Sequence, residues 1–136
     1  MSRVQALRPD SARQWGTMTA GEMVVHCADQ MRVCRGEKAV TSVRLPRLLR
    51  PLVKWIFVTR RKAFKPGMKT IRELDARAGM TPLTSFDEDR RTLLRLVGDS
   101  RGGGVVGHPL FGTLTAPEAE ELSLRHLDYH LRQFGV

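Results

Sequence analysis

Three segments of this chain begin with the same helix-initiating pattern, a Ser or Thr followed three residues later by Glu. The pairs are Thr19 with Glu22, Ser85 with Glu88, and Thr115 with Glu118. In such a capping box the hydroxyl accepts from the third helical N–H, and the Glu accepts from the N–H of the cap residue. A periodic apolar run follows each pair, so three helices are predicted. They cover about residues 19–35, 85–99 and 115–134.

The rest of the chain gives weaker helical signals and no clear strand. Residues 45–64 form a fourth, less regular helical candidate, because Pro46 and Pro51 limit where a helix can begin. Residues 101–112 are rich in Gly and are interpreted as a flexible connection. No alternating apolar pattern longer than a few residues occurs. A length of 136 residues fits one domain, so the prediction is a single all-α domain over 1–136.

The net charge of +9 belongs to one segment. Residues 38–72 hold 11 basic residues and no acidic one, whereas the rest of the chain is nearly neutral. A basic run of this kind favours a polyanion or an anionic surface as partner. No recognised nucleic-acid motif accompanies it, so no specific nucleic acid is expected.

The two cysteines and the apolar segments indicate a cytoplasmic protein. Cys27 and Cys34 are seven residues apart, about 10 Å along an intact helix, which is too far for a disulfide. Free buried thiols in a reducing compartment are therefore expected. The N-terminus has no apolar stretch of the signal-peptide kind. The most apolar stretch, 45–57, is interrupted by basic residues and is too short to span a bilayer.

His126 and His130 are the candidate metal ligands of the last predicted helix. Their spacing of four places them one turn apart on one stripe, between two apolar flanks that face inward. The opposite side carries Glu121, Arg125, Asp128 and Arg132. Two inward imidazoles without a metal would both need hydrogen-bond partners in an apolar setting. A single His-x-x-x-His spacing is common, so core histidines with such partners are the alternative interpretation.

His26 lies at the edge of the apolar face of the 19–35 helix and can supply a third nitrogen. Three histidines with an open position are typical of a catalytic metal site. Neutral imidazoles suit one divalent ion, with zinc or nickel favoured and iron as the alternative. Taken alone, His26 also fits a partly exposed packing residue. His108, in the HPLFG loop, is interpreted as a loop residue bonded to backbone.

Both ends of the chain carry longer motifs. They are WGTMTAGEMVVH at 15–26, HPLFGTLT at 108–115 and HLDYHLRQFG at 126–135. These blocks resemble the DinB-like superfamily, specifically an uncharacterised branch with a WGxMT…MxxH start, an HPxFGxLT loop and an HLDxHLRQFG ending. The middle of the chain is divergent from that pattern.

The resemblance implies a DinB-like four-helix bundle in which His26, His126 and His130 hold the metal. With the 45–64 candidate, the expected fold gains a basic helical insert between the second and third bundle helices. Members of the branch usually carry a full helix ahead of the WGxMT block, whereas here only about eight residues precede Pro9. Either the chain begins further upstream or the N-terminal helix is shortened. Relatives are regarded as metal-dependent hydrolases, and some resemble transferases that use low-molecular-weight thiols.

Two functional hypotheses follow. The first is a metal-dependent hydrolase or thiol transferase acting on an unidentified small molecule, with no general base assigned. Glu22 is expected to cap its helix, and Asp128 and Tyr129 to face solvent or orient ligands. The sequence contains no P-loop, dinucleotide fingerprint or serine-hydrolase motif.

The second hypothesis is a non-catalytic binding module that uses residues 38–72 for a polyanion or a membrane surface. Leu48, Leu52, Trp55 and Phe57 lie among basic residues there and fit an interfacial helix. They fit equally a helix that packs on the bundle with its charges solvated. Because a shortened first helix leaves apolar surface uncovered, we expect either this packing or a homodimer across the open side.

Overall fold

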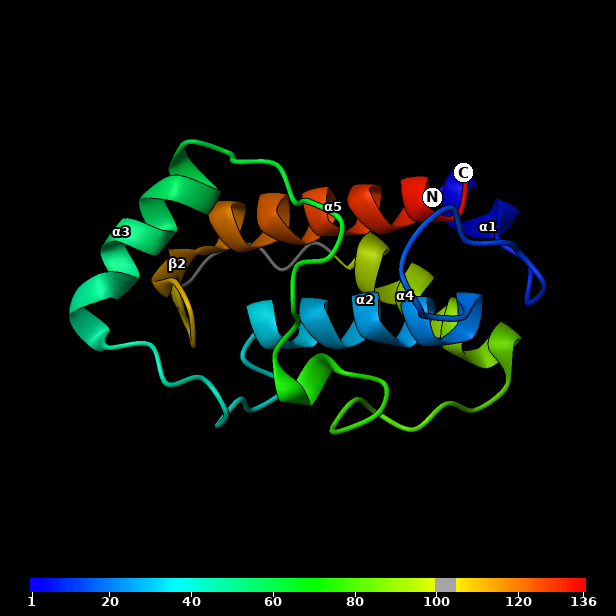
Figure 1. Ribbon diagram of the computed structural model, residues 1–136, viewed down its shortest axis with the longest axis horizontal. Helices are drawn as coiled ribbons and strands as arrows, with labels where there is room; N and C mark the ends of the chain where they lie inside the picture. Colours follow the sequence, from blue (N-terminus) through cyan, green and yellow to red (C-terminus); the bar gives the residue numbers. More distant parts are fainter. Residues whose placement is uncertain (100–104) are drawn as a thin grey trace.

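The computed structural model describes residues 1–99 and 105–136. The α-helices within these residues are α1 (Ser2–Ala6), α2 (Ala20–Cys34), α3 (Arg50–Lys54), α4 (Phe86–Gly98) and α5 (Ala116–Gln133). Two strands, β1 (Val105–His108) and β2 (Gly112–Thr115), pair antiparallel. Helix α2 contacts both α4 and α5, and α2 and α5 run side by side in opposite directions (Figure 1). No helix of the described residues is long and apolar enough to cross a membrane.

The three predicted helix starts are confirmed, each one residue after its cap. Glu22 N donates to Thr19 Oγ1 at 3.2 Å, and Thr19 N donates to Glu22 Oε2 at 2.6 Å. Thr115 N donates to Glu118 Oε2 at 2.8 Å. At α4, Ser85 Oγ accepts from the third helical N–H at 3.3 Å. These caps fix where α2 and α5 begin and therefore which residues face each other between them.

The all-α, four-helix-bundle prediction is wrong, because β1 and β2 form a two-stranded sheet. His108 pairs with Gly112, so three residues make the hairpin turn. Gly112 has a φ of +70°, which suits a three-residue hairpin loop. The sheet escaped prediction because four-residue strands are too short to show alternation. Of the predicted flexible connection, residues 105–112 are therefore hairpin, and residues 101–104 lie outside the described part.

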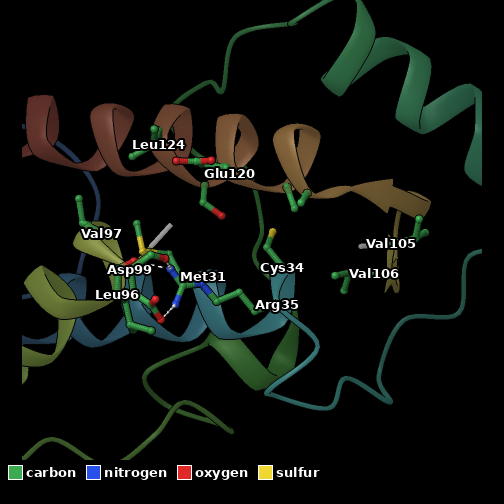
Figure 2. Close-up of a pocket in the computed structure, with 13 residues that line it drawn as sticks. Met31, Cys34, Arg35, Leu96, Val97, Asp99, Val105, Val106, Glu120 and Leu124 are labelled. Atoms are coloured by element: carbon green, nitrogen blue, oxygen red, sulfur yellow. Dashed lines mark hydrogen bonds and ion pairs between the residues drawn. The ribbon is translucent and has the colours of Figure 1, made fainter. Parts of the chain in front are cut away.

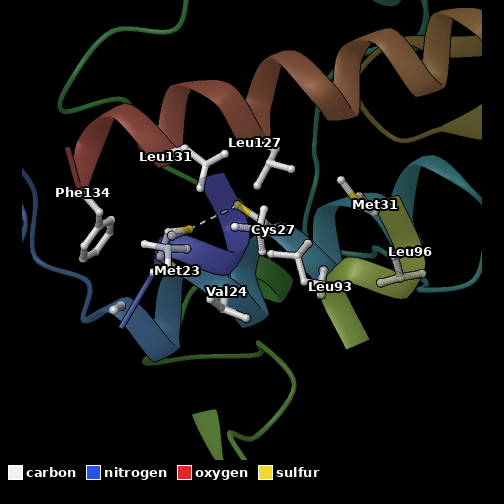
Figure 3. Packing of buried hydrophobic residues seen from close by; sticks show 13 residues of the cluster. Met23, Val24, Cys27, Met31, Leu93, Leu96, Leu127, Leu131 and Phe134 are labelled. Carbon is white, nitrogen blue, oxygen red and sulfur yellow. Dashed lines mark hydrogen bonds between the residues drawn. The ribbon is translucent and has the colours of Figure 1, made fainter. Parts of the chain in front are cut away.

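The main core lies between α2, α4 and α5. Met23 and Cys27 of α2 belong to one buried cluster with Leu93 of α4 and Leu127 of α5 (Figure 3). Although α1 has only five residues, Val4 within it and the following Leu7 are fully buried in this core. Both cysteines are free and buried, as predicted.

A second, smaller core supports the hairpin and the basic segment. Its buried residues are Cys34, Val58, Phe111, Leu114, Ala119 and Leu122. The 45–64 helical candidate is an irregular helix over 47–59, made of a 3₁₀ turn (Arg47–Leu49), α3 and a π-helical turn (Trp55–Thr59). It packs on this core, through Phe57 as expected. However, Leu48, Leu52 and Trp55 are exposed, so the expectation that all four share one packing face is wrong.

Candidate metal centre

Three histidines from the two neighbouring helices converge on one point. His26 comes from α2, and His126 and His130 come from successive turns of α5. One nitrogen from each lies within 4.8 Å of the others, and the ring centroids are 4.6 to 5.0 Å apart. The prediction that His26 faces the 126/130 pair is confirmed.

The segment after α3 closes this side of the molecule. In Figure 1, residues of the green trace pass from α3 across α5 toward α2. Phe64 of this segment lies edge-on to the His126 ring at 5.4 Å, and the carbonyl of Leu74 bonds to His26. The middle of the chain, which lies outside the end motifs, therefore supplies one wall of the histidine site.

Two of the three rings are held in a defined tautomer. His26 Nδ1 lies 2.8 Å from Leu74 O, and a carbonyl can only accept, so Nδ1 carries the hydrogen. His130 Nδ1 lies 2.8 Å from Gln133 Oε1, while Gln133 Nε2 donates to Trp15 O at 2.7 Å and so fixes the orientation of the amide. Each ring therefore presents an Nε2 lone pair. A second hydrogen bond of this kind is what orients metal-binding histidines in proteins.

His126 has one nitrogen without a protein partner. Its Nδ1 is buried and makes no hydrogen bond to the described residues, and its Nε2 lies 3.3 Å from His26 Nε2. Because His26 Nε2 has no hydrogen, the contact is either a long hydrogen bond from His126 or two lone pairs facing each other. In the first case Nδ1 is left as a buried, unpaired acceptor. In the second, a cation between the nitrogens removes the repulsion.

The same distance fits a shared metal ion. Two nitrogens bound to one tetrahedral ion at ~2.0–2.1 Å lie about 3.3 Å apart, which equals the separation of the Nε2 atoms of His26 and His126. The donor set is three imidazole nitrogens, with every ligand supplied from packed helices. The residues present therefore fit one divalent ion.

Burial keeps these histidines neutral. It is the largest cause of the lowered pKa of His26, which the hydrogen bond to Leu74 partly opposes. Burial lowers the pKa of His130 to about 4. The pKa of His126 lies well below its ordinary value because of burial and then of the neighbouring His26 and His130. Only a neutral imidazole has a lone pair for a metal, so the site is in its metal-binding form at neutral pH.

A cavity of about 620 Å³ lies beside the three histidines and is lined by all of them. One wall is aromatic. Successive ring centroids lie 4.6 to 6.3 Å apart from the hairpin to the N-terminal loop. The rings in order are His108, Phe111, Phe57, Phe64, Tyr129 and Trp15. Cavities of this size and lining bind drug-sized apolar molecules.

The other candidates have defined roles. Glu22 caps α2, although it also lines the cavity. Asp128 forms ion pairs with Arg3 and Arg132. His108 Nδ1 accepts from Leu110 N at 3.2 Å, which confirms the predicted bond to backbone, but His108 is the last residue of β1 rather than a loop residue. Tyr129 accepts a hydrogen bond from Trp15 Nε1 at 3.3 Å and keeps its own hydroxyl hydrogen for another partner.

Sequence reasoning missed the residues that orient the site. Gln133 follows His130 by three positions, a helical spacing that places both on one face, and this signal was available. The carbonyls of Leu74 and Trp15 gave no signal, because any residue has one. His108 was correctly expected to bond to backbone, but nothing in its local sequence indicated that it ends a strand or that it lines the cavity.

A second cavity, of about 230 Å³, lies between α2, α4, α5 and β1 (Figure 2). Arg35 lines it, and its guanidinium donates to the carbonyls of Leu96 and Asp99. None of the three clustered histidines lines this cavity. It therefore adds no ligand to the metal centre.

Comparison with known proteins gives one finding. Residues 1–135 match a protein family described as "Protein of unknown function (DUF1569)". No curated protein and no solved structure matches the chain.

Proposed function

The chain belongs to the DUF1569 family, and from that premise we propose that it is a metal-dependent enzyme that binds one divalent ion through His26, His126 and His130. The observation that carries the proposal is the 3.3 Å approach of two Nε2 atoms, one of which has no hydrogen to share.

The reaction class we propose is hydrolysis, or transfer of a low-molecular-weight thiol. A divalent ion with three protein ligands keeps a position open and acts as a Lewis acid toward a carbonyl, a water or a thiol. The resemblance of the end motifs to the DinB-like superfamily supports this class. Zinc or nickel is the preferred ion, with iron as the alternative.

The chain's own residues orient and enclose the reactants. Leu74 O and Gln133 hold two of the imidazole rings, and the aromatic wall binds the apolar body of a small-molecule substrate while excluding water. The Tyr129 ring lies edge-on to the His130 ring, at 4.9 Å between ring centroids, and its hydroxyl retains a hydrogen to donate to a bound substrate. No residue of the cavity is assigned as general base.

Elemental analysis of protein purified without a chelating tag tests the metal centre. We expect near-stoichiometric zinc, nickel or iron in the wild type, and a loss of tight binding of at least tenfold in His126→Ala. The matched control is His108→Asn, which changes another buried histidine of the same cavity outside the cluster. Equal metal content in His126→Ala and the wild type would contradict the site.

A substrate screen tests the enzyme. Ester hydrolysis and conjugation of a small thiol to an electrophile are measured with the metal-loaded protein, with the apo-protein after chelation, and after metal is restored. We expect activity that disappears on chelation and returns with the ion. Stoichiometric metal with no turnover on either class would leave a metal-binding protein and exclude both reactions for the substrates tried.

A further inference from the structure

The irregular helix over 47–59 has two apolar faces, and the core covers only one of them. Val53, Phe57 and Val58 pack on the second core. On the other side Leu48, Leu52 and Trp55 are 88%, 54% and 50% exposed. Their spacing of four and three places them on one helical stripe. Figure 1 shows α3 at the end of the molecule opposite both termini, with its outer side turned away from the other helices.

Exposed cations flank this stripe along the chain. Three of the 11 basic residues of 38–72 form ion pairs, through Lys38, Lys54 and Arg61. Seven others are exposed and form no ion pair with the described residues, namely Arg44, Arg47, Arg60, Lys62, Lys65, Lys69 and Arg72. Arg60 lies over the Trp55 ring at 5.3 Å. Lys65 and Lys69 line the histidine cavity, so the cations next to the stripe along the chain are Arg44, Arg47, Arg60 and Lys62. An apolar stripe flanked by unpaired cations is the pattern of a helix that lies in a membrane interface.

We propose that the outer face of 47–59 docks on an anionic lipid membrane, with Leu48, Leu52 and Trp55 entering the boundary between headgroups and acyl chains. The flanking Arg and Lys side chains then contact lipid phosphates. Thirteen helical residues extend about 20 Å, enough to lie along a membrane surface and too few to span it. This proposal uses no residue of the metal cluster and does not depend on it.

Charge and apolar exposure together select this partner. A second copy of the chain would bring two sets of unpaired cations together, which like-charge repulsion opposes. A nucleic acid would neutralise the cations but leave the Leu stripe in water, and it would find one exposed ring on this face rather than a series of stacking platforms. An anionic bilayer satisfies both features.

Hydrogen bonds hold the 47–59 helix on the rest of the protein, so it can dock as a preformed helix. Lys54 Nζ donates to Thr113 O and to Glu118 Oε2, each at 2.8 Å. On the other flank Arg125 donates to Phe57 O at 2.9 Å and Lys62 O at 3.0 Å. These bonds tie the inner face to β2 and α5, so that docking needs no refolding.

Co-sedimentation of the full chain with vesicles tests the proposal. The vesicles are phosphatidylcholine alone, or phosphatidylcholine with 30% phosphatidylglycerol. We expect binding to the anionic vesicles and at least tenfold weaker binding to the neutral ones. Leu52→Ser combined with Trp55→Ser should weaken anionic binding about tenfold or more, and Arg47→Gln should weaken it about fivefold. The matched control is Leu124→Ser on α5, where a leucine is 43% exposed outside the segment.

Three results would overturn the proposal. One is equal binding of the double variant and the Leu124 control while both keep the wild-type melting temperature. Another is binding to heparin as tight as to anionic vesicles and unchanged in the double variant, which would identify a soluble polyanion as the partner. The third is a wild-type dimer in analytical ultracentrifugation that the double variant abolishes, which would identify a second copy as what covers the stripe.

Discussion

The α2–α5 pair and the 47–59 segment both carry apolar residues at helical spacing. The first buries nearly all of them, with Leu124 of α5 as an exception, whereas the second leaves one apolar face exposed. In α2, Met23 and Cys27 are almost completely buried, and the polar His26 is buried with them. In the basic segment Leu48 and Trp55 face solvent. Helical periodicity therefore shows that a face is apolar but not what covers it.

Polar groups differ between the two regions in the same way. At the histidine cluster His26 and His130 each have a short bond that fixes the ring, and the remaining lone pairs converge. Around 47–59 most cations have no acidic partner within the described residues. The first arrangement suits a small ion held at fixed geometry. The second suits a broad, fluid, negatively charged surface.

The largest expected effect comes from truncating equivalent leucines in the two regions. Leu93 of α4 has no exposed surface, and it lies in the main core. Leu93→Ala should lower the free energy of unfolding by about 2–5 kcal/mol, because it removes buried methyl groups and leaves a cavity. Leu52→Ala, at a half-exposed site, should lower it by less than about 1 kcal/mol. Urea unfolding followed by circular dichroism measures both, and equal losses would contradict the distinction between the two regions.

Removing the metal should destabilise the protein through the histidine site between α2 and α5, and changes in the 47–59 segment should not alter this effect. An ion bound only by the folded chain stabilises it by about 2.7 kcal/mol at a hundredfold excess over Kd. EDTA should therefore lower the melting temperature by several degrees. His130→Ala should melt lower from the start and respond little to EDTA, whereas Leu52→Ala should respond as the wild type does. An undiminished EDTA shift in His130→Ala would mean that the chelator acts elsewhere.

Much of this architecture was predictable from short-range pattern. A capping box involves residues three apart, so Thr19 and Thr115 indicated where α2 and α5 begin. The His126/His130 pair followed from helical spacing. The assignment of His26 to the same site needed the family resemblance as well as its position on a helix edge, because local pattern cannot show which helices meet.

Most of the features of the fold and the site that were not predicted depend on contacts between residues far apart in the sequence. The hairpin was missed because its strands have four residues each and its glycines resembled a loop. Leu74, which orients His26, is 48 positions away from it and acts through its backbone. Whether Leu48 and Trp55 are buried or exposed depends on how the 47–59 helix is oriented on the second core, and periodicity does not determine that orientation.

As the pH falls, the free energy of unfolding should decrease because of a histidine that lines the cavity rather than because of the basic segment. Burial lowers the pKa of His108 to about 4, whereas a histidine in an unfolded chain titrates near ~6.5. Between these values the unfolded chain binds the extra proton, so the free energy of unfolding falls as pH decreases from about 6.5 to 4. The loss from His108 is on the order of 2 kcal/mol at pH 5.

His108→Asn removes the titrating group and keeps an acceptor for the Leu110 N–H. Unfolding is measured at pH 7 and pH 5 in the presence of EDTA, so that metal release does not contribute. The variant should lose less stability than the wild type between the two values. A loss as large as that of the wild type would place the acid sensitivity elsewhere.

The smallest effect should appear at the link between the two regions. Lys54 joins the 47–59 segment to β2 and α5 through Thr113 O and Glu118, but the pair is partly exposed, so Lys54→Met should cost no more than about 1 kcal/mol globally. Locally the consequence is larger, because local opening of this segment requires far less free energy than global unfolding. Amide hydrogen exchange should therefore accelerate in 50–59 while α2 and the α5 residues around His126 keep their protection. Faster exchange throughout α5 would show instead that the basic segment and the histidine site unfold as one unit.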